Sequence, residues 1–152
     1  MTEETTAPAA AAVPTAVRGE PAAQTAEDRV TIRMPAEGAY LSVLRTATAG
    51  LAARLDFTLD EIEDLRIAVD EACGLLLSQA SPGADLDCDF TLAEDSVTIA
   101  VSVPSRRPQL PARDTFAWTV LSALAGNADA WVGPGNKVTV LLRKVRESSG
   151  SG

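Results

Sequence analysis

The stretch TLDEIEDLRIAVDEACGLLLSQA, residues 58–80, decides the fold because its pattern is typical of one long amphipathic helix. Thr58 and Glu61 have the spacing of a capping box, in which a hydroxyl and a carboxylate satisfy free backbone amides at a helix start. Apolar residues then recur at steps of three or four, which predicts a face that packs on a sheet. The members of this face are Ile62, Leu65, Val69, Ala72, Leu76 and Ala80.

Two acidic residues, Asp70 and Glu71, interrupt the middle of this apolar pattern. Acids this late in a helix gain nothing from the helix dipole, which favours negative charge only near the first turn. Taken alone, the pair is typical of a solvated helix edge, because Asp and Glu are seldom buried without a partner. The neighbouring residues favour a second interpretation, in which one acid belongs to a functional site.

The string DLRIAVDEACGLLL, residues 64–77, resembles the N-box helix of the histidine-kinase-like ATPase (GHKL) family. It is most similar to bacterial anti-sigma factors of the serine-kinase type. In that family the helix carries an acid that serves as general base and, four residues later, an Asn that holds the magnesium bridging the ATP phosphates. Glu71 matches the acid, whereas Leu75 stands in place of the Asn. Leucine cannot ligate a hard cation that requires oxygen ligands, so no metal site is expected here.

The other nucleotide motifs of the family are altered as well. The strand ending near Val103 should be followed by Asp-x-Gly-x-Gly, but residues 104–108 read PSRRP. The family also carries Gly-x-Gly at the start of the third helix, where bare amides cradle phosphates. Thr115 and Ala117 stand where these glycines would be, and Thr115 adds a branched side chain. The resemblance therefore implies no cofactor, or weakly bound ATP and magnesium.

Arg106 and Arg107 lie in the altered loop and leave two interpretations open. Guanidinium groups suit phosphate oxygens, so Arg106 is a candidate nucleotide contact together with Thr115 and Ala117. Alternatively, both arginines are simply exposed in a loop.

Composition limits the class of protein. With 152 residues, a net charge of −8 and no histidine, the chain has the size of one domain and lacks the basic cluster that nucleic-acid or anionic-membrane binding requires. The acidic start MTEETTAPAA has no apolar segment typical of a secretory signal. We therefore expect a cytoplasmic protein whose two cysteines, Cys73 and Cys88, are reduced and buried.

The remaining pattern predicts an α/β (α+β) two-layer sandwich, with a mostly antiparallel sheet and three helices on one face. Residues 1–27, rich in Ala, Pro and Thr, are expected to be a disordered tail, 28–146 the GHKL-like domain, and 147–152 a flexible tail. The predicted elements, in the order β-α-α-β-β-α-β-β, cover residues 30–34, 37–55, 58–80, 86–92, 97–103, 115–124, 130–132 and 138–145.

Several details of the helices follow from the same patterns. Asp114 is expected to cap the third helix. Phe116 is placed on the inward face of that helix, whereas the pattern assigns Trp118 to neither face. Two interpretations are open for both aromatics: they are core residues, or they contact a partner. In the helix over 37–55, Tyr40 and Val43 are assigned to the apolar face.

The resemblance implies a function as an anti-sigma factor, which sequesters an alternative sigma factor until a small STAS-type anti-anti-sigma factor releases it. The acidic surface would complement a basic sigma domain. The alternative is an active serine kinase that phosphorylates the STAS antagonist, with Glu71 as base, and a third possibility is an α/β regulatory scaffold with another ligand. The resemblance leaves open whether the protein also forms a homodimer.

Overall fold

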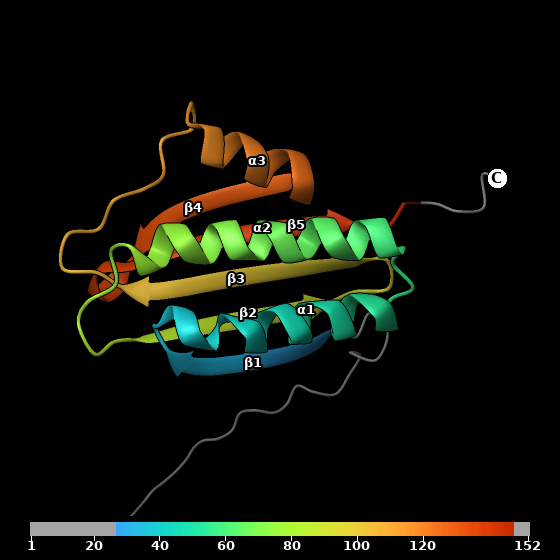
Figure 1. The fold of residues 1–152 in the computed structure, drawn as a ribbon, viewed down its shortest axis with the longest axis horizontal. Helices are drawn as coiled ribbons and strands as arrows, with labels where there is room; N and C mark the ends of the chain where they lie inside the picture. Colours follow the sequence, from blue (N-terminus) through green and yellow to red (C-terminus); the bar gives the residue numbers. More distant parts are fainter. Residues whose placement is uncertain (1–26, 148–152) are drawn as a thin grey trace, which may run out of the picture.

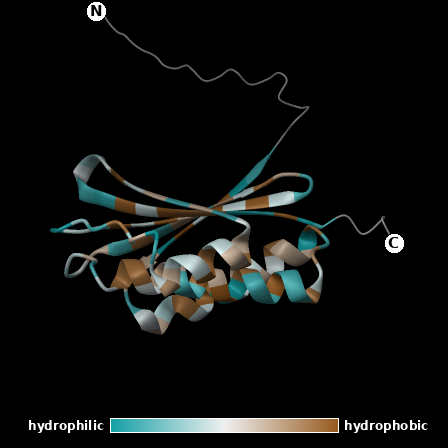
Figure 2. Cartoon of the chain, turned by 90° about the horizontal axis from the view of Figure 1, so that it is seen from above, coloured by the Kyte–Doolittle hydropathy of each residue, from teal (hydrophilic) through white to brown (hydrophobic). Residues whose placement is uncertain are grey.

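The computed structural model describes residues 27–147, which form a single sheet with three helices packed on one of its faces (Figures 1 and 2). The sheet has five strands in the order β1-β2-β3-β5-β4, and every neighbouring pair is antiparallel. This confirms the predicted two-layer α+β architecture. The elements are β1 (Asp28–Pro35), α1 (Leu41–Arg54), α2 (Leu59–Leu77), β2 (Asp85–Leu92), β3 (Ser96–Pro104), α3 (Phe116–Ala125), β4 (Asn127–Gly133) and β5 (Lys137–Val145). Apart from Glu27 and Glu147, the two predicted tails lie outside the described residues.

Helix α2 lies between α1 and α3 and packs on β3 and β5 (Figure 1). Its capping box is present, with Glu61 N–H donating to Thr58 Oγ1 over 3.1 Å and Thr58 N–H donating to Glu61 Oε1 over 2.8 Å. The helix ends at Leu77, three residues before the predicted end. The physical reason is local, because the Ser78 hydroxyl donates to the Leu75 carbonyl over 2.8 Å and a turn follows.

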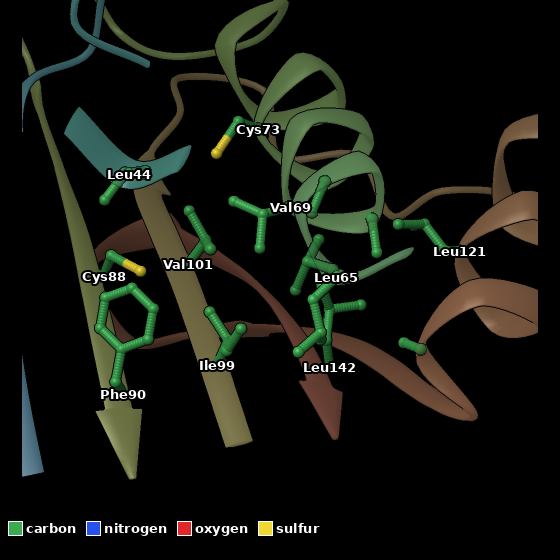
Figure 3. Close-up of a cluster of buried hydrophobic side chains, with 14 of the residues drawn as sticks. Leu44, Leu65, Val69, Cys73, Cys88, Phe90, Ile99, Val101, Leu121 and Leu142 are labelled. Carbon is green, nitrogen blue, oxygen red and sulfur yellow. The ribbon is translucent and has the colours of Figure 1, made fainter. Parts of the chain in front are cut away.

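The core between the layers is built mainly from aliphatic side chains. Figure 3 shows Leu65 and Val69 of α2 facing Ile99 and Val101 of β3, with Phe90 of β2 beside them. All five side chains are buried. The alternation of apolar and polar residues along β2 and β3 places one face of each strand against the helices, as the sequence predicts.

Both cysteines belong to this core and are free. Burial raises the pKa of the Cys73 thiol to about 12 and also raises the pKa of Cys88. Neither thiol is ionised near neutral pH, so both act as small apolar residues in the described structure.

The first helix departs from its prediction. Residues Gly38–Tyr40 form a 3-10 turn, and α1 begins only at Leu41. The buried row of α1 is Leu44, Thr48 and Ala52, whereas Tyr40 and Val43 are 43% and 46% exposed. Placing these two residues on the apolar face was therefore wrong. The tighter 3-10 turn rotates Tyr40 out of the row, and Val43 lies a quarter turn away from Leu44.

The third helix is capped one residue later than predicted. Thr115, not Asp114, is the N-cap, and its hydroxyl accepts a hydrogen bond from Trp118 N–H over 3.2 Å. Phe116 becomes the first helical residue and is 83% exposed, while Trp118 is only 5% exposed. The assignment of Phe116 to the inward face was wrong, because the buried row runs through Trp118, Leu121 and Ala125.

Strand β4 is longer than the predicted 130–132 segment. Gly126 adopts a positive φ of 93° and turns the chain directly from α3 into β4, which then pairs with β5 from Asn127 to Gly133. A residue with a side chain rarely adopts this φ, so glycine permits the abrupt turn.

In the described part of the chain, none of the helices combines the length and apolarity needed to cross a bilayer.

Candidate functional site

The two mid-helix acids of α2 have different surroundings. Asp70 accepts two hydrogen bonds from Arg45 Nε, over 2.8 and 2.9 Å, and thereby ties α2 to α1. Glu71 is partly exposed and makes no hydrogen bond or ion pair within residues 27–147. Asp70 is thus a structural residue, and Glu71 is the acid that remains available for contact with another molecule.

Leu75, one turn after Glu71, packs against the hydrophobic core. Its side chain offers no oxygen at the position where the family places the Asn ligand of magnesium. Among residues 27–147, no group of three His, Cys, Asp or Glu side chains is arranged to hold a metal ion. At position 75 this helix therefore carries an apolar side chain that supplies no metal ligand.

A polar hollow of about 530 Å³ lies at the C-terminal end of α2. Its walls are residues 78–82 from the end of α2 and the following turn, and residues 105–107 with Gln109 from the segment after β3. Arg106 therefore reaches the hollow, as a nucleotide contact would. Glu71, Thr115 and Ala117 do not line it.

A side-chain amide joins the two walls of this hollow. Gln79 Nε2–H donates to the Gln109 carbonyl over 2.8 Å, and Gln109 N–H donates to Gln79 Oε1 over 2.9 Å. We call this pair of hydrogen bonds the Gln79 clamp. Sequence analysis missed it because its partners are 30 residues apart and Gln109 contributes only backbone atoms, which no residue pattern reveals.

Backbone hydrogen bonds hold the start of the same segment. Ser81 N–H donates to the Pro104 carbonyl over 2.9 Å, and Ser105 N–H donates to the Asn136 carbonyl over 3.0 Å. Ser105 is buried, and its hydroxyl oxygen accepts a hydrogen bond from Arg107 N–H. The segment has no regular secondary structure, as predicted, but it is attached to three other parts of the fold.

The end of the segment is held by Arg113 and Thr115. The Arg113 guanidinium lies 4.3 Å from the ring centroid of Trp118 and forms an ion pair of 3.0 Å with Asp129 on β4. The hydrogen bond from Arg113 lowers the pKa of Asp129 below its usual value. Thr115 Oγ1–H donates to the Ala112 carbonyl over 2.8 Å while its oxygen caps α3. Position 115 is thus a helix cap here.

The described residues do not fit a magnesium-nucleotide complex. Leu75 supplies no ligand oxygen, and residues 104–117 contain no glycine whose bare backbone could approach a phosphate. The Thr115 hydroxyl, which stands where a glycine is expected, already has partners in both directions. Gln79 and Gln109 satisfy one another across the hollow, so neither needs a ligand to complete its hydrogen bonds.

Calorimetric titration with ATP and magnesium should therefore show no binding tighter than roughly tens of micromolar, which corresponds to about −6 kcal/mol. The physical reason is the loss of the metal ligand and of the phosphate cradle described above. A control titration at the same concentrations without magnesium should give the same heats. Tight, magnesium-dependent binding would show that the interpretation of positions 75 and 104–117 is wrong.

A buried carboxylate, Glu61, joins the start of α2 to the chain just after β5. Its Oε1 accepts from Thr58 N–H, and its Oε2 accepts from Glu147 N–H over 2.8 Å. Burial acts to raise the pKa of Glu61. The hydrogen bonds from the Thr58 and Glu147 amides, the Thr58 side chain and the positive charge of Lys144 together outweigh burial, so the pKa lies below its usual value. The capping box predicted the first bond, whereas the second spans 86 residues and had no local signal.

This lowered pKa makes a testable contribution to stability. Glu61→Gln should lower the free energy of unfolding at pH 7 by about 1–2 kcal/mol, because one charged acceptor of two backbone amides is lost. Because the folded-state pKa is lower than the unfolded one, this contribution is full above about pH 4.5 and disappears as the pH falls through the folded-state pKa. Denaturant unfolding of both proteins between pH 7 and pH 3 measures the difference. A gap that stays constant over this range would contradict the assignment.

Comparison with known proteins identifies relatives of this chain. No protein-family model matches the chain. It is 31% identical over 102 residues to the anti-sigma-F factor RsbW of Mycobacterium tuberculosis, covering 67% of this chain and 61% of the relative. It is 33% identical over 78 residues to the serine-protein kinase RsbW of Bacillus subtilis, covering 49% of each chain. The chain thus spans about half the length of the Bacillus relative and three fifths of the mycobacterial one.

A solved structure shows the same fold. The crystal structure of the RsbU and RsbW domains of a Mycobacterium tuberculosis protein matches with a TM-score of 0.61 and 16% sequence identity, over 78% of this chain and 32% of that one. The fold, the N-box-like helix and the RsbW relatives agree with one another. The chain is therefore a homologue of the RsbW proteins and has a fold similar to that solved structure.

Proposed function

We propose that the protein is an anti-sigma factor, which binds an alternative sigma factor and keeps it from RNA polymerase. The observation that carries this proposal is the 31% identity over 102 residues to an anti-sigma-F factor. The net charge of −8 supports it, because a sigma factor must present basic surfaces to DNA and opposite charges raise the rate of association. Capture of a protein also requires none of the nucleotide determinants that the chain has altered.

Release of the sigma factor is proposed to depend on a STAS-type anti-anti-sigma factor that competes for the same protein. We therefore also propose that the protein works in the bacterial cytoplasm, where both proposed partners and the polymerase would be found. We also propose that the protein self-associates, which sedimentation equilibrium of the full chain would test.

Co-purification of the tagged full chain from its host tests this function. A sigma factor should be recovered, and addition of the purified STAS antagonist should displace it in a size-exclusion experiment. Recovery of neither a sigma factor nor a STAS protein would contradict the proposal.

A serine kinase acting on the STAS antagonist is the second candidate. It is supported by the availability of Glu71 at the position of the family's base and by the relative named a serine-protein kinase. The altered positions around Leu75 and Thr115 favour weak or absent activity, because a phosphoryl transfer needs charge stabilisation from the metal. If labelled phosphate does appear on a serine of the antagonist, Glu71→Ala should abolish the transfer without changing the melting temperature.

A further inference from the structure

We propose that the Gln79 clamp fixes the segment 104–115 without any bound nucleotide. Its consequence for function, which depends on the anti-sigma proposal above, is that capture of the sigma factor is independent of ATP and ADP.

The first support is the geometry of the clamp. A primary amide has a donor and an acceptor side by side, and Gln79 uses both on one residue, bonding the N–H and the C=O of Gln109 over 2.9 and 2.8 Å. The two bonds go to the peptide groups on either side of the Gln109 Cα, so together they fix the orientation of the backbone at this residue as well as its distance. The backbone at Gln109 is therefore already paired with the turn that follows α2.

The second support is the position of the clamp along the segment. The start is held by the hydrogen bonds of Pro104 and Ser105, and the end by Arg113 and the Thr115 cap. Gln109 lies between these attachments, so the clamp fixes the middle. Proline residues at 104, 108 and 111 reduce the number of conformations that must be given up when the segment is ordered.

The third support is what the segment presents. Leu110 directly follows the clamped residue and is 49% exposed, and Phe116 follows the Thr115 cap and is 83% exposed. Both apolar side chains are thus attached to backbone that is held in place by the chain itself. A surface fixed in this way has less conformational entropy to lose when a partner binds.

Hydrogen exchange at the Gln109 amide tests the clamp directly. Gln79→Ala removes both bonds, whereas Gln109→Ala keeps them because that residue contributes only its backbone. The amide at position 109 should be protected in the full wild-type chain and in Gln109→Ala, and its protection factor should fall about tenfold or more in Gln79→Ala. Amides in β3 should exchange equally in all three proteins. Equal protection at position 109 in all three would overturn the proposal.

Binding to the sigma factor recovered from the host tests the consequence. The wild-type affinity should change by less than about twofold on addition of ATP or ADP with magnesium, and Gln79→Ala should weaken it about five- to tenfold while Gln109→Ala does not. A requirement for nucleotide would overturn the inference alone. If the wild type binds no sigma factor under any condition while the exchange pattern is as expected, the proposed function fails and the clamp stands.

Discussion

Phe90→Ala should lower the free energy of unfolding by about 3–5 kcal/mol, the largest effect on stability expected from a single truncation in this protein. Phe90 is completely buried in β2, and its strand neighbours are Val30 on β1 and Ile99 on β3. Its ring lies beside Cys88 and Ile99 under the helices (Figure 3). In a core of mostly aliphatic residues, no neighbouring side chain is large enough to fill the resulting space.

Urea denaturation of the wild type and the variant measures this loss. Leu59→Ala is the matched control, because Leu59 is 84% exposed and its truncation should change the unfolding free energy by less than about 0.5 kcal/mol. A loss below about 1 kcal/mol for Phe90→Ala would mean that the layers pack differently from the arrangement described.

Phe116→Ala should weaken binding of the sigma factor about 30-fold or more, without lowering the melting temperature. A 30-fold rise in the Kd corresponds to a loss of about 2 kcal/mol in binding free energy, which is typical of a large aromatic anchor at an interface. The side chain is 83% exposed on the first turn of α3, so its removal creates no cavity. The Thr115 cap that positions it does not depend on the ring.

Isothermal titration with the purified sigma factor measures the effect, and Leu59→Ala again serves as control. Leu59 is equally exposed but is the first residue of α2, and Figure 1 shows the start of α2 remote from the 104–115 segment. Its truncation should leave the affinity unchanged. Unchanged affinity in Phe116→Ala would remove this aromatic from the capture surface.

Local signals predicted most of the fold. The capping box at Thr58 and the alternation along β2 and β3 are short-range patterns, and the structure confirms them. The errors lie where the first residue of a helix sets which face the following side chains occupy. Moving the cap from Asp114 to Thr115 turned Phe116 from an expected core residue into an exposed one. Similarly, a 3-10 turn before α1 exposed Tyr40, and sequence patterns do not distinguish such a turn from the first turn of a helix.

The candidate site could be predicted only in part. Motif positions identified Glu71, Leu75 and the altered loop, because each depends on spacing along the chain. The contacts that shape the site join distant residues, as Gln79 does with the Gln109 backbone and Arg113 with Asp129. Such contacts depend on how helices and loops meet in space. Arg106 reaches the hollow, whereas Thr115 and Ala117 do not line it.

The hydrogen bond between Glu61 and Glu147 determines where the last strand leaves the domain. In Figure 1, β5 ends at one extremity of the molecule, while the 104–115 segment lies at the opposite extremity. A fluorophore coupled next to Glu147 would therefore stay clear of a protein docked on that segment. The same attachment point could tether the molecule to a biosensor chip with its capture side facing the solution.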